Sequence, residues 1–194
     1  MKKDSFAGHT IYSTNKIDKD INIDHILQTF QQNSEKYNYT HFIKNRWENI
    51  YLNPQDIPAV LPLLSFMIST ALELYQDILN PHQTLVIPHE LLGYEKNEFW
   101  FNAATIGEST GIHNHNEHAI ISGVFYLQAP KNSANLFFKS GKNNEFEMKV
   151  ERGKIIFFPS ELNHYVPENK SNKTRISLSF NLYKFPLAAS FMNE

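Results

Sequence analysis

A chain of 194 residues with 41% hydrophobic and 20% charged residues has the size and composition of one globular domain that builds its own core. Its net charge of −2 argues against a nucleic-acid ligand or an anionic membrane surface, and it contains no apolar run near the length of a membrane span. Cysteine is absent, which excludes disulfides and thiolate metal sites and is compatible with the cytoplasm, where we expect the protein to lie. Any bound metal must therefore be held by His, Asp or Glu.

The N-terminal half carries the helical patterns of the chain. A helix is predicted near residues 24–37, with Asp24 as its N-cap and apolar residues at helical spacing behind it. A longer helix is predicted over residues 54–80, where apolar residues recur every three or four positions. Pro62 is compatible with the first turns of this helix, and the Asn-Pro pair at Pro81 ends it. Such a broad apolar stripe is typical of a helix that packs on a sheet.

Two other N-terminal segments have no helical period. Residues 6–12 are predicted to form a short edge strand. The segment 37–53 is mixed and rich in aromatic residues, and Trp47 within it is a candidate for a sheet edge or for the wall of an opening. Two interpretations stay open for this segment and the helices beside it, a lid over a site and the surface of a homodimer.

From about residue 83 the hydrophobic period changes from helical toward two. About seven apolar or alternating runs follow at roughly ten-residue spacing, separated by Gly, Pro, Asn and Lys clusters: TLVIP, EFWFNAATIG, IISGVFYLQAP, NLFFKS, FEMKV, KIIFFPS and RISLSFNLY. This pattern predicts an all-β sandwich, barrel or jelly roll. We expect a single domain over residues 1–194, in which residues 1–95 supply helical support and edge strands and residues 96–185 form the β core.

The run HNHNEH at residues 113–118 concentrates side chains that can bind a metal. Alternate side chains of an extended chain share a face, so His113, His115 and Glu117 are expected to point the same way. Two imidazoles, or an imidazole and a carboxylate, can then hold one divalent ion together. The run follows a glycine-bearing turn and precedes the apolar strand IISGVFYL, which places it at the mouth of a strand.

A second stretch, GKIIFFPSELNHYVPENKSNKTRISLSFN, reads as two strands joined by a polar connection. The first strand ends in a proline that stops ladder bonding, and we expect the residues after it to return His164 toward the core mouth. Two ligands from one strand and one from a distant strand form the facial arrangement of non-haem Fe(II) oxygenases, which leaves coordination positions open.

Arg175 opens the last strand and alternates there with apolar residues. Two placements remain open. Arg175 faces water while Ile176 and Leu178 face the core, as is usual because arginine is rarely buried unpaired. Alternatively the interior of the barrel is polar and receives Arg175 and Ser177, in which case a dicarboxylate ligand would offset the burial of the guanidinium.

The elements HNH, SGVFYL, FFPSELNHYV and RISLSFNL together resemble the 2-oxoglutarate/Fe(II)-dependent dioxygenase superfamily, and within it a group of bacterial and phage oxygenases with the pattern H-x-H, S-G-V-x-Y, F-P-S, H-x-V and R-x-S-x-x-F-N. The match covers roughly residues 97–183. The resemblance implies a double-stranded β-helix, a jelly-roll, cupin-like barrel with supporting helices. It also implies an Fe(II)- and 2-oxoglutarate-dependent dioxygenase that hydroxylates a small molecule or an amino-acid side chain and releases succinate and CO2.

The resemblance implies that His113 is the first metal ligand and His164 the distal one. The chain departs from the wider superfamily at His115, which stands where an Asp or Glu is usual. Two ligand sets therefore compete. The first consists of His113, His115 and His164, and the second replaces His113 with Glu117.

For the cosubstrate, the resemblance implies that Arg175 pairs with the distal carboxylate of 2-oxoglutarate and that Ser177 assists it. Tyr126 and Asn102 lie on strands that reach the cosubstrate or the substrate in such barrels. O2 and one organic substrate are the other partners implied, with neither nucleic acid nor membrane. Trp47, Trp100 and Phe101 are candidates for pocket walls, although core packing explains each of them as well.

Two other classes of function compete with this one. The first is a cupin-like metalloenzyme of another reaction class, and the second is a non-catalytic jelly-roll binding protein with surface histidines. Arg175 and Ser177 discriminate among them, because neither alternative needs an inward arginine at this position.

Overall fold

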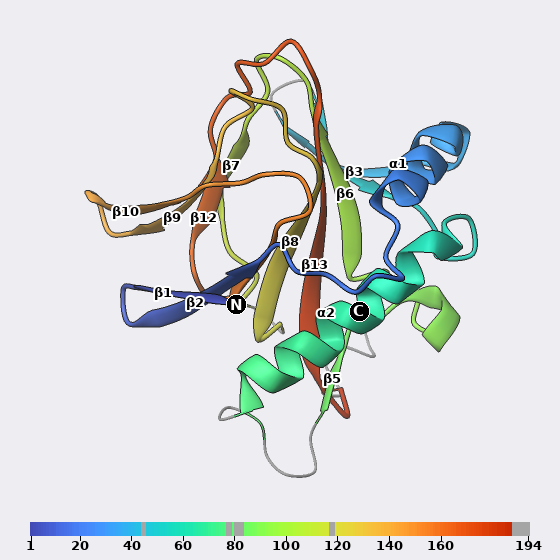
Figure 1. Cartoon of the computed structure of the whole chain (residues 1–194), viewed down its shortest axis with the longest axis horizontal. Helices are drawn as coiled ribbons and strands as arrows, with labels where there is room; N and C mark the ends of the chain where they lie inside the picture. Colours follow the sequence, from blue (N-terminus) through green and yellow to red (C-terminus); the bar gives the residue numbers. More distant parts are fainter. Residues whose placement is uncertain (44–45, 77–78, 80–83, 117–118, 188–194) are drawn as a thin grey trace.

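The computed structural model describes residues 1–43, 46–76, 79, 84–116 and 119–187, and within them the fold is mainly β, with two sheets that face each other (Figure 1). The larger sheet has the strand order β1 (Lys2–Phe6), β2 (His9–Thr14), β11 (Ile155–Pro159), β8 (Ile121–Gln128), β13 (Arg175–Phe185), β6 (Phe99–Ala104), β4 (Arg46–Tyr51) and β3 (Asn38–Ile43), and β5 (Thr84–Val86) also pairs with β13. The smaller sheet has the order β10 (Asn144–Met148), β9 (Leu136–Ser140), β12 (His164–Val166) and β7 (Thr110–His113). The jelly-roll architecture predicted from the sequence is confirmed, although strand pairing among the described residues does not close the two sheets into one barrel.

Two helices and three short 3-10 segments accompany the sheets in the described part of the chain. They are α1 (Ile23–Gln32), α2 (Leu61–Leu74), η1 (Ser34–Lys36), η2 (Pro58–Val60) and η4 (Glu90–Leu92). Both helices pack on the outer face of the larger sheet, where Phe30 of α1 stacks on Phe101 of β6 with ring centroids 4.3 Å apart. Neither helix is long and apolar enough to cross a membrane, and no other described helix is.

The period-two pattern separates two apolar clusters. Phe125, Leu178 and Phe180 point outward and pack with the helices in the larger cluster. Val124 and Tyr126 flank Phe125 on β8 and therefore point to the opposite face, between the two sheets, where they pack in the smaller cluster. The inner face of β13, in contrast, carries mostly polar side chains, so the space between the sheets is apolar on the β8 side and polar along β13.

Several N-terminal predictions need correction. The N-cap of α1 is Asn22, whose side chain accepts from the backbone N–H of His25, whereas Asp24 lies in the first turn. The helix ends at Gln32 because the following residues tighten into η1. The regular helix α2 begins at Leu61, with Pro62 in its first turn, so residues 54–60 form turns and a 3-10 segment instead of helix. The helix α2 ends at Leu74, earlier than the predicted end at residue 80, and residues 77–78 and 80 of the prediction lie outside the described residues.

The two segments without helical period are both hairpins. Residues 2–14 form β1 and β2 around a turn in which Ala7 and Gly8 have positive φ, so the predicted strand at residues 6–12 is divided by this turn. The segment 37–53 contains both β3 and β4, which pair antiparallel at the free edge of the larger sheet. The seven runs predicted as strands correspond to β5, β6, β8, β9, β10, β11 and β13.

Candidate metal and cosubstrate site

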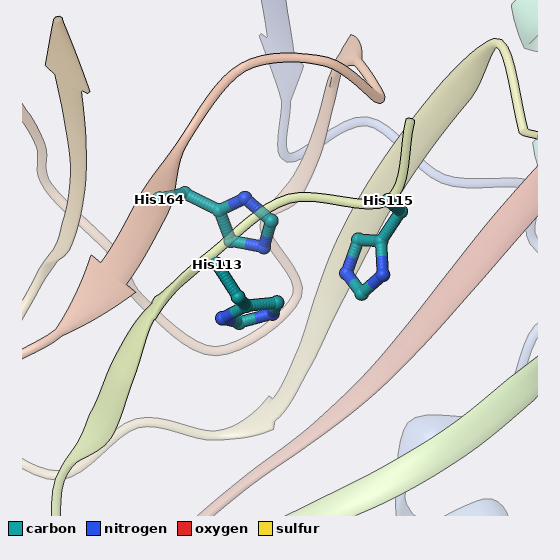
Figure 2. Close-up of side chains that lie close together, drawn as sticks. All are labelled: His113, His115 and His164. Carbon is teal, nitrogen blue, oxygen red and sulfur yellow. The ribbon is translucent and has the colours of Figure 1, made fainter. Parts of the chain in front are cut away.

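Three histidines meet at the edge of the smaller sheet. His113 ends β7 and His164 begins β12, and the two residues are partners in the antiparallel ladder between these strands. His115 lies two residues beyond His113. The ring centroid of His113 lies 4.3 Å from the centroid of His164 and 4.9 Å from that of His115. Each histidine offers one ring nitrogen, and these three atoms all lie within 4.8 Å of one another. Figure 2 shows the rings of His113, His115 and His164, called the triad below, gathered around one space.

Backbone carbonyl groups orient two of these rings. The Nδ1 atom of His113 lies 2.9 Å from the carbonyl oxygen of Gly111, and Nδ1 of His164 lies 3.0 Å from that of Leu162. A carbonyl oxygen only accepts, so Nδ1 carries the hydrogen in both rings, and Nε2 is the nitrogen that offers a lone pair in the neutral ring. This is the arrangement that presents an imidazole to a metal ion with its other nitrogen held.

Burial keeps the imidazoles of His115 and His164 neutral. Desolvation lowers the pKa of His115 to about 3, and the neighbouring His113 adds to this shift. The pKa of His164 is likewise well below its usual value, mainly because the ring is buried and then because His113 and His115 lie beside it. Neutral imidazole is the form that binds a metal, so these two rings are ready to act as ligands at neutral pH. Glu117 and His118 lie outside the described residues, and the ligand set that includes Glu117 is therefore not tested by the structure.

The triad opens on a cavity of about 360 Å³ between the two sheets. The opposite wall is formed by β13 and its neighbours β6 and β8, and in the sheet register Ser177 pairs with both Asn102 and Tyr126. These three side chains and Arg175 all line the cavity. The four side chains predicted from the sequence to lie near a cosubstrate therefore line the same cavity as the triad.

Arg175 is only 1% exposed. Of the two placements that the sequence left open, the structure has the one in which Arg175 points into the molecule. Its Nη1 donates to the carbonyl oxygen of Ser133, but no ion pair joins it to a carboxylate among the described residues. Burial lowers the pKa of this guanidinium, and burial also raises the pKa of the neighbouring Tyr126 to about 12, so that tyrosine is a neutral phenol. A buried cation without an anionic partner is costly, and an anionic ligand would remove this cost.

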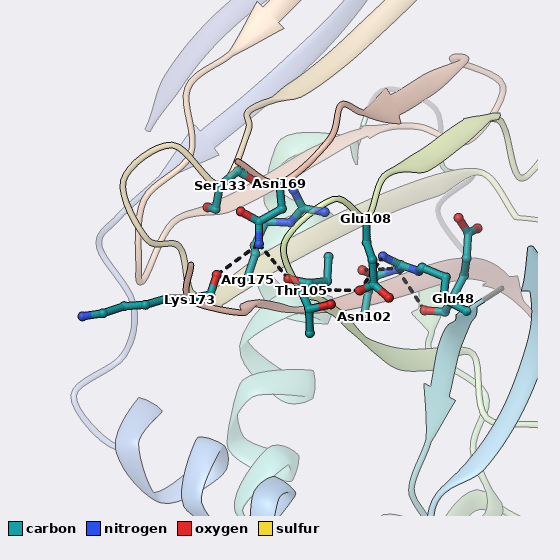
Figure 3. A network of polar contacts seen from close by, with 10 residues as sticks. Glu48, Asn102, Thr105, Glu108, Ser133, Asn169, Lys173 and Arg175 are labelled. Carbon is teal, nitrogen blue, oxygen red and sulfur yellow. Dashed lines mark hydrogen bonds and ion pairs between the residues drawn. The ribbon is translucent and has the colours of Figure 1, made fainter. Parts of the chain in front are cut away.

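The loop before Arg175 is fixed by Asn169, a fully buried residue. Its Nδ2 donates to the carbonyl oxygens of Ala104, at 2.8 Å, and Lys173, at 3.0 Å, which ties this loop to the end of β6 (Figure 3). Its Oδ1 accepts from the backbone N–H of Ser171. Nothing in the spacing of the motifs had indicated this residue.

A second buried arginine, Arg46 on β4, was also not predicted from the sequence. Its Nη2 donates to Oδ1 of Asn102 at 3.1 Å, and its Nη1 lies 3.5 Å from a carboxylate oxygen of Glu108. Asn102 in turn donates to the backbone carbonyl of Glu48 at 2.9 Å (Figure 3). Arg46 therefore fixes the amide of Asn102 where it lines the cavity beside Ser177.

The three aromatic candidates for pocket walls have different positions. Trp100 lines the cavity, and its ring centroid lies 5.5 Å from that of His115. Phe101 is fully buried in the core under α1, so its role is core packing, the alternative to a pocket wall. Trp47 is 45% exposed on the β3–β4 hairpin and does not line the cavity.

A jelly roll that presents three imidazoles to a cavity, opposite a buried arginine, can hold a metal ion and an anionic ligand in the same site. Residues 138–181, which include His164 and Arg175, match the family described as "Putative 2OG-Fe(II) oxygenase". This match, which covers less than half of the chain, and the fold together support the resemblance to the superfamily of 2-oxoglutarate- and Fe(II)-dependent oxygenases that the motifs had predicted. These enzymes use Fe(II) and 2-oxoglutarate, with O2 and an organic substrate.

Solved structures of low sequence identity share the fold. A Pseudomonas putida prolyl-4-hydroxylase is 17% identical and has a TM-score of 0.61, covering 91% of this chain and 94% of its own. SnoK, a non-heme alpha ketoglutarate dependent carbocyclase from nogalamycin biosynthesis, is 10% identical with a TM-score of 0.65, covering 89% of this chain and 79% of its own. A prolyl hydroxylase from Trichoplax adhaerens, in complex with a peptide fragment, is 13% identical with a TM-score of 0.57 over 90% of this chain and 83% of its own. Among curated protein sequences, no match is found.

Proposed function

We propose that this oxygenase hydroxylates a C–H bond of a small molecule or of an amino-acid side chain. In the balanced reaction, the substrate, O2 and 2-oxoglutarate give the alcohol, succinate and CO2. One oxygen atom enters the alcohol and the other enters succinate. The observation that carries the proposal is the placement of the three histidines and Arg175 on opposite walls of one cavity.

We propose His113, His115 and His164 as the metal ligands. The donor set fits iron, because imidazole nitrogen suits Fe(II) and three ligands leave coordination positions open for small molecules. Bound Fe(II) would supply the redox chemistry that couples O2 reduction to oxidation of the cosubstrate and the substrate. The carbonyl groups of Gly111 and Leu162 support the assignment, because they accept from Nδ1 of two rings and leave Nε2 of each ring as the atom that can bind a metal. The alternative set, with Glu117 in place of His113, keeps the same distal ligand.

We propose that Arg175 binds the distal carboxylate of 2-oxoglutarate. A guanidinium can bind a carboxylate through two parallel hydrogen bonds, which suits one fixed end of a dicarboxylate. The hydroxyl groups of Ser177 and Tyr126 lie on the same cavity wall and are proposed to complete this carboxylate site. Asn102, held by Arg46, is proposed to contact the cosubstrate or the substrate at the next position of the wall.

The buried arginine favours this function over a cupin-like enzyme of another reaction class and over a non-catalytic binding protein. A cosubstrate with an anionic end explains why β13 carries a guanidinium toward the cavity, whereas the chemistry of the other two classes does not require one. The net charge of −2 supports the proposal that neither nucleic acid nor a membrane is a partner, and the absence of cysteine supports a cytoplasmic location.

We also propose that residues 1–194 form a single domain. The helices and strands before residue 96 supply part of the apolar cluster that covers the outer face of the core sheet, which supports this view. The β3–β4 hairpin exposes Tyr39, Phe42 and Trp47 beside the cavity mouth, so its proposed role is a lid or a homodimer surface. Light scattering on the purified chain separates the two, because only the second predicts a dimer.

The proposed function is tested by adding Fe(II) and 2-oxoglutarate to the protein without O2. We expect a weak visible charge-transfer band from the chelate and a higher melting temperature, because a ligand that binds the native state stabilises it. A band that forms with wild-type protein but not with the His164→Ala variant supports the triad. If neither the band nor stabilisation is observed, the proposed function is wrong.

A further inference from the structure

The inner face of β13 carries a second polar group at the end opposite Arg175. Arg175, Ser177, Ser179 and Asn181 all line the cavity. Six residues of a strand span roughly 20 Å, so Arg175 and Asn181 lie at opposite ends of the wall. Asn181 pairs with Ser122 on β8, and its backbone N–H donates to the carbonyl oxygen of Glu98, just before β6. Glu98, Asn181 and Ser122 therefore form one row across three neighbouring chain segments.

The hydrogen bonds of this row run in one direction, toward Glu98. The Ser122 hydroxyl donates to Oδ1 of Asn181 at 2.7 Å, and Nδ2 of Asn181 donates to a carboxylate oxygen of Glu98 at 3.2 Å. Since the Ser122 hydrogen is used in this way, the Ser160 hydroxyl at 2.8 Å must donate to Ser122. The amide orientation of Asn181 is fixed, because the flipped amide would place an oxygen against the carboxylate. The row thus holds the side chain of Glu98 at the cavity wall.

Two aromatic rings stand beside this carboxylate. Tyr51 and Trp100 both line the cavity, with their ring centroids 6.3 Å apart. Burial raises the pKa of Tyr51, and the negative charge of Glu98 adds to the shift, which places the phenol within electrostatic reach of the carboxylate. The faces of such rings attract a cation, most strongly where water is excluded.

The triad borders this end of the cavity. The backbone N–H of His115 donates to the carbonyl oxygen of Ser160 at 2.8 Å, and the His115 ring lies 5.5 Å from Trp100 between centroids. Apart from histidines, the described residues that line the cavity carry a positive charge at Arg175 and negative charges at Glu48 and Glu98. Because the charges of Fe(II) and of the dianion 2-oxoglutarate would offset each other, the two glutamates would outweigh Arg175 and favour a cation in the rest of the cavity.

We propose that Glu98, with Trp100 and Tyr51, binds a primary ammonium group of the substrate beside the triad. A carboxylate has about four acceptor sites, so it holds Asn181 and accepts further N–H donors as well. A carboxylate flanked by two aromatic rings suits an ammonium group better than it suits an anionic or a purely apolar substrate. The inference rests on the proposed function, since it deepens the substrate class of the same site.

An ammonium group has two sources, a free amine or amino acid and the side chain of a lysine in a polypeptide. The probes are free L-lysine, compared with its Nα,Nε-diacetyl form, and an N-acetylated, C-amidated tripeptide with a central lysine, compared with its Nε-acetyl form. Binding to the full chain with Fe(II) and 2-oxoglutarate, without O2, is measured by calorimetry, which needs no turnover. Succinate release is then measured in air.

We expect at least one ammonium probe to bind at least about tenfold more tightly than its acetylated form, since losing a charge-assisted hydrogen bond has an effect of this order. The Glu98→Gln variant is expected to lose this preference, and Glu98→Asp to keep part of it. Trp100→Leu, which leaves the carboxylate in place, is expected to weaken the ammonium probes and not the acetylated ones. The control is Glu95→Gln, an exposed glutamate of the same segment, which should bind as the wild type does.

The outcomes separate this inference from the proposed function. A charge-transfer band in wild type and Glu98→Gln alike, together with the loss of ammonium binding in the variant, supports both. Failure of both ammonium probes to bind, or equal binding by Glu98→Gln, overturns the ammonium assignment while the band still supports the oxygenase. Absence of the band overturns the proposed function, whatever the probes do. If only the tripeptide binds, the ammonium group belongs to a polypeptide.

Discussion

His113 and His164 face each other as partners in the antiparallel ladder between β7 and β12, with their ring centroids 4.3 Å apart. The two residues belong to distant parts of the sequence, and the ladder sets their separation without any loop that must fold over them. His115 then needs only the short extended segment after β7 to join them. A metal ligand set built on paired strands is held more rigidly than one built on loops.

The His164→Ala variant is expected to lose metal binding and turnover while it keeps the fold. Loss of a ligand should cost more than the roughly 10- to 100-fold typical of groups that only orient a ligand. Fe(II) affinity, succinate release and circular dichroism provide the measurements. His25→Ala, which removes an exposed histidine on α1, is the matched control and should behave as the wild type does. Turnover that survives in His164→Ala would show that this residue is not a ligand.

The sequence predicted the core of the fold because the larger strands carry a clear alternation. Phe99 and Phe101 point to the helices while Trp100 and Asn102 point to the cavity, and the same phase relation holds along β13. In contrast, β7 has only four residues and β12 only three, too few for a period to be recognised. The strands that carry the triad were therefore found as motifs and not as strands.

The supporting contacts of the site could not be predicted in the same way. Arg46 reaches Asn102 across β4 and β6, and Asn169 reaches Ala104 from a loop far along the chain. Both contacts depend on which strands become neighbours, and one sequence contains no local signal for that choice. The inward placement of Arg175 stayed open for the same reason, since alternation alone does not say which face of β13 is polar.

Gly123 on β8 is expected to tolerate no side chain. A Cβ at this position would clash with Cζ of Phe180 and lie 2.7 Å from the carbonyl oxygen of Ile156, so neighbouring backbone would have to move. Gly123→Ala should therefore lower the free energy of unfolding by about 1–3 kcal/mol, the usual effect of overpacking a core. Urea denaturation measures this change.

Gly111→Ala is the matched control for the Gly123 prediction. No atom lies within 4 Å of the position its Cβ would take, and Gly111 does not have a positive φ. Its stability is expected to be unchanged or slightly higher, because alanine restricts the unfolded chain. Equal losses in both variants would contradict the steric explanation.

The metal-free protein is expected to lose stability as the pH falls below about 6.5, the pKa of an unperturbed histidine. Burial lowers the folded-state pKa of His89, His115 and His164. Below pH 6.5 the unfolded chain therefore binds more protons than the folded one, and stability falls with pH. For His115 this loss continues until its folded-state pKa of about 3 is reached.

Melting temperatures with a chelator at pH 7.5, 6.5 and 5.5 measure this dependence. His89 provides a test outside the triad, because it is buried and its Nδ1 has no hydrogen-bond partner. The His89→Phe variant should show a smaller decrease between pH 7.5 and 5.5 than the wild type. A melting temperature that stays constant or rises over this range would contradict the assignment of neutral, buried histidines.

Replacement of Arg175 by methionine is expected to have opposite effects on cosubstrate binding and on the stability of the free protein. The variant loses the charged hydrogen bonds to a carboxylate, worth about 1.5–3 kcal/mol, so the KM for 2-oxoglutarate should rise roughly ten- to hundredfold. Without ligand, however, the guanidinium is buried with no carboxylate partner among the described residues. An apolar side chain of similar length removes that desolvation penalty, so the melting temperature of the ligand-free variant should be unchanged or higher.

The Arg175→Lys variant tests whether the effect depends on charge alone. Lysine keeps the charge but lacks the planar fork of donors, so it should restore only part of the 2-oxoglutarate affinity. Fe(II) affinity should be the same in all three proteins, because Arg175 lies on the wall opposite the triad. A ligand-free Arg175→Met protein that melts well below the wild type, with Fe(II) binding lost as well, would instead show that the bond to Ser133 makes this arginine a structural residue.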